Sequence, residues 1–141
     1  MTNNLVLLSE SGEESVFVNR SDGLAISYFK KLGIKQYIIS TEENPVVSKR
    51  GEKLQIEVFQ GIDNKLDKIK TIMDDHKWQK NDVAFIGNDL NDIEVIDYLP
   101  NTFCPKDSHL EVLNKVNKIL DRDGGDGVIM CFYNHIGSLI E

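Results

Sequence analysis

The sequence predicts an α/β fold, with a parallel sheet flanked by helices and a β-hairpin at the N-terminal end. Apolar segments of strand length alternate with helical patterns, which is the order typical of a parallel sheet with crossover helices. Residues 83–86 form an apolar run that ends abruptly at Gly87, as a buried parallel strand does. The start of the chain breaks this alternation. Apolar residues 5–8 and 15–18 flank a polar loop that contains glycine, which indicates a hairpin.

The remaining elements follow in chain order. Helix 22–32 brings Leu24, Ile26 and Phe29 to roughly one face, and Pro45 stands where a proline opens a helix. The expected strands cover residues 36–40, 56–60, 83–86 and 101–104, with 118–120 as an edge strand. The expected helices cover residues 22–32, 45–53, 66–76, 91–98 and 107–116. No internal repeat or linker is visible, so residues 1–141 are expected to form a single domain.

Charge and composition narrow the range of partners. The 141 residues carry a net charge of −7, which argues against nucleic acid or an anionic membrane as the main partner. No apolar run approaches the ~20 residues that span a bilayer. No secretory signal is visible at the start, and Cys104 and Cys131 lack the spacing of metal ligands. A cytoplasmic protein with two buried free thiols is therefore expected.

A cluster of oxygen-bearing side chains follows the strand at residues 83–86. Asn88, Asp89 and Asp92 lie around one turn, where a hard cation such as Mg²⁺ could bind. The carboxyl ends of parallel strands form the ligand crevice of such sheets, which favours this interpretation. The alternative is an ordinary helix start, because Asn and Asp are preferred N-caps.

Three further candidates lie at or beyond predicted strand ends. Ser40 and Thr41 end one strand. Their hydroxyls could bind a phosphate oxygen, or the two residues could be an N-cap or ordinary turn residues. Lys65 begins a helix, where the dipole disfavours a cation unless an anionic ligand compensates. Residues 19–23 offer a second cation, Arg20, and a cap. Together these groups are suited to hold a phosphoryl group against Mg²⁺.

The order of Ser40, Lys65 and residues 87–92 resembles motifs two, three and four of the haloacid dehalogenase superfamily. Within it, the chain is most similar to capless phosphatases that act on 3-deoxy-octulosonate 8-phosphate and on related nine-carbon sugar acids. Segments 19–26, 38–42 and 124–127 fall at the spacing of this group. The first two resemble the phosphatase-like domain that is fused to or paired with acylneuraminate cytidylyltransferases.

The resemblance implies a Rossmann-like sheet and hydrolysis of a phosphomonoester of an acidic sugar. It implies that Ser40 and Lys65 bind the phosphoryl group, and that Mg²⁺ is held directly or through water by Asn88, Asp89 and Asp92. The residues implied for substrate binding are Arg20, Asp22, Gly23 and Thr41. The hairpins of relatives pair in a homotetramer, and a cytidylyltransferase is a possible partner.

The resemblance also exposes an absence. The first motif of the family is a central strand ending in two aspartates, the nucleophile and the acid–base, and it would lie upstream of Met1. The chain is thus expected to be truncated relative to the family, to lack that strand and to be inactive by itself. With Asp126 in the glycine loop near the C-terminus, this supports an alternative: a non-catalytic oligomerisation or regulatory domain linked to CMP-sialic acid synthesis. A receiver-like domain is a third option, but no suitable acceptor aspartate follows a central strand.

Overall fold

The strands form two parallel sheets and one antiparallel hairpin. The structure, a computed structural model, describes residues 2–140, and side chains within residues 2–137. Strand β3 (Tyr37–Ile39) pairs in parallel with β4 (Glu57–Phe59). Strands β5 (Ala84–Ile86), β6 (Asn101–Pro105) and β7 (Lys118–Leu120) form a second parallel sheet in that order. The predicted α/β architecture is confirmed. Among the described residues no strand joins β3 to β5, so the sheet is in two parts.

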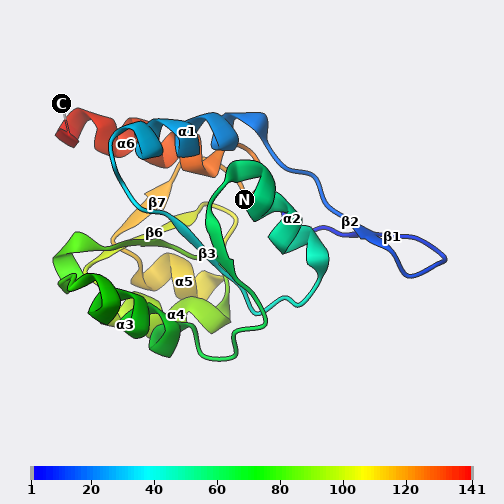
Figure 1. Cartoon of the computed structure of the whole chain (residues 1–141), viewed down its shortest axis with the longest axis horizontal. Helices are drawn as coiled ribbons and strands as arrows, with labels where there is room; N and C mark the ends of the chain where they lie inside the picture. Colours follow the sequence, from blue (N-terminus) through cyan, green and yellow to red (C-terminus); the bar gives the residue numbers. More distant parts are fainter. Residues whose placement is uncertain (1, 141) are drawn as a thin grey trace.

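Helices cover both faces of these sheets (Figure 1). Helix α1 (Arg20–Lys31) packs against α6 (Val128–Ile140) on one side. Helices α3 (Lys65–His76), α4 (Ile93–Tyr98) and α5 (Leu110–Lys115) form the other layer, and α2 (Pro45–Leu54) packs on β4. Two short 3₁₀ turns, η1 (Lys80–Asp82) and η2 (Leu90–Asp92), flank β5.

Asparagine side chains start three of the helices. Asn19 accepts a hydrogen bond from the Ser21 amide, Asn44 from Val46 and Asn64 from Asp67, each at 2.8–2.9 Å. An N-cap satisfies an amide that has no partner within the helix. The caps of α2 and α3 follow β3 and β4 directly, so both helices begin at the carboxyl edge of the small sheet.

The core lies between the helix layers and the sheets. Phe29 of α1, Leu120 of β7 and Phe132 of α6 form one buried cluster with Val128. On the opposite face, α3 and α4 bury a second cluster, to which Ile39 of β3 and Phe85 of β5 also contribute. Both sheets therefore pack on the same α3–α4 layer.

Helix α6 is absent from the expected elements. Its first turn takes its acceptor from Asp22 of α1, whose Oδ1 accepts hydrogen bonds from the amides of Ile129 (2.8 Å) and Met130 (3.3 Å). These groups are more than a hundred residues apart in the sequence. A local capping signal therefore could not have predicted this helix. Helix α5 begins at Leu110, after its N-cap His109, and not at residue 107 as predicted.

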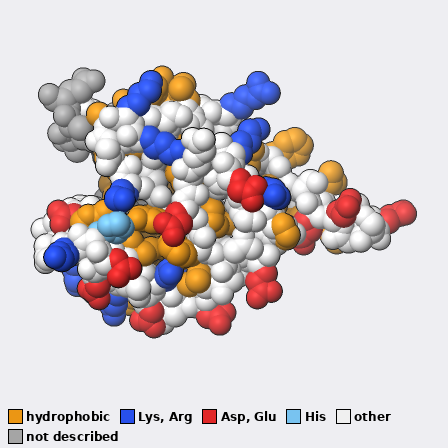
Figure 2. All heavy atoms as spheres, viewed as in Figure 1, with side chains coloured by type: hydrophobic (Ala, Val, Ile, Leu, Met, Phe, Trp, Pro, Cys, Tyr) orange, Lys and Arg blue, Asp and Glu red, His pale blue; other side chains and the backbone are white. Residues whose placement is uncertain are grey.

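The hairpin is present but shorter than expected, and it projects from the body of the protein (Figure 1). Its arms are β1 (Leu7–Leu8) and β2 (Glu14–Ser15), so residues 16–18 are not a strand as predicted. Figure 2 shows hydrophobic and acidic side chains mixed along it. The apolar residues that remain exposed there are Leu5, Val6, Leu7, Leu8 and Phe17.

The described part of the chain contains no helix with the length and apolar character needed to span a bilayer. Cys104 and Cys131 are both free thiols, and Cys104 is buried. Burial raises the pKa of the Cys104 thiol, which keeps it protonated and unreactive.

Candidate functional site at the carboxyl edge

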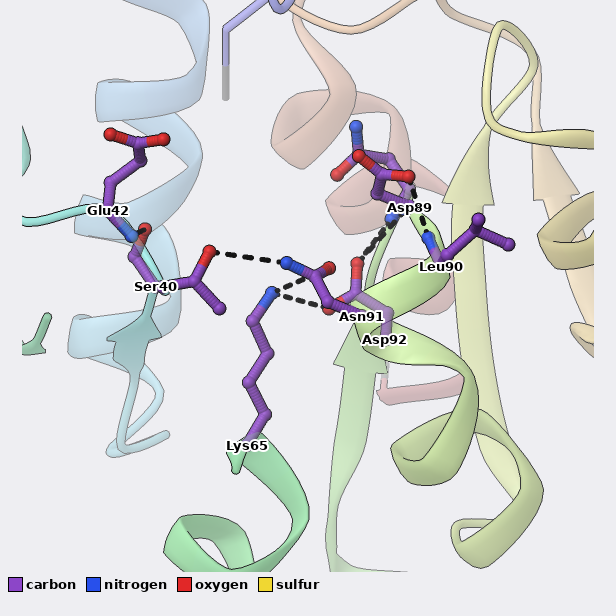
Figure 3. Close-up of polar contacts among 9 residues, drawn as sticks. Ser40, Glu42, Lys65, Asp89, Leu90, Asn91 and Asp92 are labelled. Carbon is purple, nitrogen blue, oxygen red and sulfur yellow. Dashed lines mark hydrogen bonds and ion pairs between the residues drawn. The ribbon is translucent and has the colours of Figure 1, made fainter. Parts of the chain in front are cut away.

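The sequence motifs meet where β3 and β5 end (Figure 3). Ser40 follows β3, Lys65 is the first residue of α3, and residues 88–92 follow β5. Because parallel strands end at the same edge of a sheet, these distant segments come together there. Figure 3 shows the Lys65 side chain reaching from α3 to the loop beyond β5.

A buried ion pair forms the centre of this edge. The Lys65 Nζ atom lies 2.6 Å from Asp92 Oδ1, and the two side chains are only 10% and 3% exposed. Lys65 Nζ also donates to Asn91 Oδ1 at 3.3 Å. Two charges that are shielded from water interact strongly, but each depends on the other for compensation. The ion pair therefore fixes the ammonium group at the edge of the sheet.

The second carboxylate oxygen of Asp92 organises the loop. Asp92 Oδ2 accepts hydrogen bonds from the backbone amides of Asn88 (2.8 Å) and Asp89 (3.2 Å). Asp89 Oδ1 in turn accepts from the Leu90 amide at 2.7 Å. This is the capping arrangement that the sequence left as an alternative to a metal site. Both Asp92 oxygens are therefore occupied by protein donors.

Gly87 makes this loop geometry possible. A Cβ atom at Gly87 would lie 2.7 Å from Asp92 Oδ2 and 2.7 Å from the Phe85 ring. Such distances are well inside van der Waals contact, so any side chain at residue 87 would displace the carboxylate or the strand. Close packing therefore requires a glycine at the end of the apolar run.

Asn91 connects the two sides of the site, a role that the sequence analysis did not assign. Its Nδ2 donates to Thr41 Oγ1 at 3.2 Å, while its Oδ1 accepts from Lys65. Ser40 Oγ accepts a hydrogen bond from the Glu42 amide at 3.1 Å. Hydroxyl groups from the β3 end and the ammonium group thus lie at one edge. Only the position of Asn91 between two predicted site residues could have indicated its role.

Oxygen ligands for a cation are few at this edge. Asp89 is exposed and Asn88 is half-buried, whereas Asp92 is buried. Within residues 2–140, no three His, Cys, Asp or Glu side chains group together as they do in a metal site. The metal-binding role expected for Asn88, Asp89 and Asp92 therefore stays a prediction.

The predicted substrate-binding residues near α1 are arranged differently. Arg20 is exposed, but Asp22 is fully buried and caps α6. Burial raises the pKa of Asp22, and the two amide hydrogen bonds and the charge of Arg50 partly offset this. A Cβ atom at Gly23 would lie 3.3 Å from the Leu54 side chain and 3.9 Å from Arg50, whose guanidinium group donates to the Asn19 carbonyl oxygen. Asp22 and Gly23 thus help to join α1 to α6 and α2, and their predicted substrate contact stays a prediction.

These elements define an α/β fold whose carboxyl edge carries a fixed lysine, hydroxyl groups and an acidic loop. The sequence profile of haloacid dehalogenase-like hydrolases matches residues 33–132, more than half of the chain. The chain belongs to this family, which confirms the resemblance noted from its motifs.

Relatives of two kinds are similar to this chain. N-acylneuraminate cytidylyltransferase A of Danio rerio is 29% identical over 140 residues, which cover 96% of this chain and 32% of that protein. The 3-deoxy-D-manno-octulosonate 8-phosphate phosphatase of Yersinia pestis is 27% identical over 130 residues, 92% of this chain and 70% of that protein. The chain therefore spans about a third of the length of the cytidylyltransferase that it matches.

Solved structures confirm the fold. A HAD family hydrolase from Streptomyces avermitilis has a TM-score of 0.92 and 34% identity, covering 94% of this chain and 76% of that one. A 3-deoxy-D-manno-octulosonate 8-phosphate phosphatase from Moraxella catarrhalis has a TM-score of 0.88 and 22% identity, covering 99% of this chain and 84% of that one. The Moraxella protein was crystallised with a magnesium ion, a phosphate ion and a KDO molecule.

Proposed function

We propose that this chain is the phosphoryl-binding part of a haloacid dehalogenase-type phosphatase for acidic sugar phosphates of the octulosonate or nonulosonate class. The observation that carries this proposal is the buried Lys65–Asp92 pair beside the Ser40 and Thr41 hydroxyls. A fixed ammonium group costs no reorganisation when it meets a phosphoryl oxygen. The likeness to the Yersinia pestis phosphatase supports the substrate class.

Each group has a distinct role in this proposal. Ser40 donates a hydrogen bond to a phosphoryl oxygen, and Lys65 balances its charge. The exposed Asp89 carboxylate and the Asn88 amide oxygen would hold Mg²⁺, and Asp92 would act on the ion through water because its oxygens already accept protein hydrogen bonds. The ion would balance the negative charge of the phosphoryl group when bound. Arg20 and Thr41 contact the rest of the anionic sugar.

Turnover also requires a nucleophile and a proton donor, and this proposal assigns neither role to the residues that bind the phosphoryl group and the ion. Asp121 and Asp123 are spaced by one residue and follow β7, but β6 separates β7 from β5 in the sheet. They therefore follow a strand that lies two places along the sheet from β5. The proposal therefore assigns phosphoryl binding to this chain and no attacking group for covalent phosphoryl transfer.

We expect purified 1–141 to bind phosphate weakly with Mg²⁺ and to show no appreciable turnover. Acid–base catalysis alone contributes about 10²–10⁴ in rate, and the nucleophile is lacking as well. The assay measures phosphate release from acidic eight- and nine-carbon sugar phosphates, with Lys65→Ala as the matched control. Release well above that of the control would show that another residue acts as nucleophile.

Binding is measured separately from turnover. Calorimetric titration with inorganic phosphate and Mg²⁺ should give a signal for 1–141 that Lys65→Ala abolishes. Equal binding by both proteins would contradict the proposed role of Lys65 and hence the proposed function.

A second candidate is a non-catalytic domain that oligomerises or regulates a cytidylyltransferase in CMP-sialic acid synthesis. The likeness to the Danio rerio enzyme over 96% of this chain and the exposed apolar hairpin support it. Large exposed apolar patches mark interaction sites. In this role the hairpin pairs with the hairpins of other copies, and the phosphoryl-binding residues have no catalytic function.

Light scattering tests the role of the hairpin. We expect 1–141 to form an oligomer, with a tetramer as the specific expectation, at micromolar concentration. A double variant, Leu7→Ser with Phe17→Ser, should shift it to the monomer because both side chains are exposed, Phe17 by 81%. The control variant Leu110→Ser changes an equally exposed leucine on α5 and should leave the mass unchanged. A monomeric 1–141 would exclude a hairpin-mediated oligomer.

A further inference from the structure

We propose that a pocket at the amino edge of the β5–β6–β7 sheet binds a small organic anion, namely a carboxylate carried on a ring or another flat apolar body. The pocket has a volume of about 630 Å³ and is lined by residues 79–81 and 97–100. A volume of this size is typical of small-molecule sites. This inference does not rest on the proposed function.

The position of the pocket separates it from the candidate site. Residues 79–81 lead through η1 into the amino end of β5, and residues 99–100 lead from α4 into the amino end of β6. Lys65 and the loop of residues 88–92 meet beyond the carboxyl end of β5. Because β5 and β6 are parallel, their amino ends share the opposite edge of the sheet. A ligand in the pocket would therefore not touch Lys65.

Two ammonium groups lie beside one aromatic ring of the pocket. Tyr98, the last residue of α4, lines the pocket and is half-buried. Lys80 Nζ, from η1, lies 3.7 Å from the centre of the Tyr98 ring, and Lys70 Nζ, from α3, lies 5.1 Å from it. Cation–π attraction favours these positions of the ammonium groups. Three separate elements thus bring two positive charges to the same ring.

No carboxylate of the described chain neutralises these two charges. The ion pairs within residues 2–140 include neither Lys70 nor Lys80. The acidic groups of the surrounding elements are already engaged. Asp97 accepts two hydrogen bonds from Lys115, both at 2.7 Å, and Asp82 accepts one from a backbone amide at 2.8 Å. Two neighbouring cations without a counter-charge, in a chain with a net charge of −7, favour an anionic ligand.

The rest of the lining indicates that the anion is organic. Leu99 and Pro100 line the pocket next to the Tyr98 ring. An inorganic ion would fill little of the volume and leave these apolar groups wet, whereas a flat apolar body would remove their water. A carboxylate only accepts hydrogen bonds, and an ammonium group only donates them. An aromatic carboxylate is the simplest ligand that satisfies both parts of the pocket.

The test titrates the full chain with benzoate. Benzamide is the matched control, because it has the same ring without the charge. Trp78 is the single tryptophan, directly precedes the lining segment 79–81 and packs on the same cluster as Tyr98, so its fluorescence reports on the pocket. Benzoate should change this fluorescence saturably, and benzamide should not. Lys80→Met should weaken benzoate binding by about tenfold because it removes a charge-assisted hydrogen bond, and Lys70→Met should weaken it as well.

Two further variants serve as controls. Lys118→Met removes an exposed lysine of β7 that also has no ion pair in the described chain, and it should bind benzoate as the wild type does. Lys65→Ala should also bind as the wild type does, and this result separates the pocket from the candidate site.

The proposal is overturned if Lys80→Met and Lys118→Met bind benzoate equally, if benzamide binds as well as benzoate, or if Lys65→Ala abolishes binding. Displacement of benzoate by an equal concentration of inorganic phosphate would contradict the role given to Leu99 and Pro100, and with it the organic nature of the ligand.

Discussion

Replacing Asp92 with alanine should lower the free energy of unfolding by about 3–5 kcal/mol. The substitution leaves the Lys65 ammonium group, 10% exposed, without its carboxylate partner. It also removes the acceptor for the Asn88 and Asp89 amides, so the loop after β5 loses its organising contact. Urea unfolding followed by circular dichroism measures the change.

An exposed ion pair of similar geometry provides the control. Lys115 Nζ lies 2.7 Å from Asp97 Oδ1, but the side chains are 40% and 53% exposed. Asp97→Ala should therefore cost only about 0–1 kcal/mol, because water screens the pair. If Asp92→Ala destabilised the protein no more than Asp97→Ala, burial of the Lys65–Asp92 pair would not be the source of its strength.

Asp22→Ala should be the second severe substitution. It removes the carboxylate oxygen that accepts hydrogen bonds from the Ile129 and Met130 amides at the start of α6. Each buried donor left without a partner costs about 1–3 kcal/mol. Amide exchange in the first turn of α6 should accelerate together with the loss of stability in urea unfolding.

Asp126→Ala is the matched control for this substitution. Asp126 also precedes α6, but its side chain is 62% exposed and lies 3.6 Å from an equally exposed Arg122. We expect little change in stability. Equal effects of the two substitutions would mean that the negative charge near the helix start matters, and not the hydrogen bonds of Asp22.

The pH dependence of stability separates the charge of Asp22 from its hydrogen bonds. Because burial raises its pKa in the folded state, the protonated form stabilises the fold. That contribution is fully present below the unfolded-state pKa and is lost as pH rises through the folded-state pKa. Asp22→Asn keeps an oxygen acceptor but does not titrate. The wild type should therefore lose stability relative to Asp22→Asn as pH rises above the ordinary pKa of an aspartate, about 4. A stability difference that does not change with pH would contradict the raised pKa.

Local signals predicted much of the fold. The apolar runs at residues 36–40, 56–60 and 83–86 contain β3, β4 and β5, and Pro45 begins α2 as expected. Because parallel strands end at the same edge of a sheet, the sequence also predicted that Ser40, Lys65 and residues 88–92 lie close together. These predictions succeed because strand and helix patterns, and the ends of parallel strands, depend on a few neighbouring residues.

Other features depend on contacts between distant residues. Helix α6 was not predicted because its capping residue, Asp22, lies far away in the sequence. No capping residue next to the helix indicates where it begins. The hairpin arms were predicted too long, since apolar residues 16–18 do not pair. Asn91 gained its role only when Thr41 and Lys65 came within reach of its two amide atoms.

The sequence by itself determined the class of fold, the family and the residue types at the carboxyl edge. Those follow from periodicity, from glycine at residue 87 and from the order of the motifs. The tertiary structure alone decided that Asp92 pairs with Lys65 and accepts hydrogen bonds from the loop amides, and that Asp22 caps α6. The physical reason is that a hydrogen-bond donor or acceptor acquires its partner from packing, and packing joins segments that the sequence keeps apart.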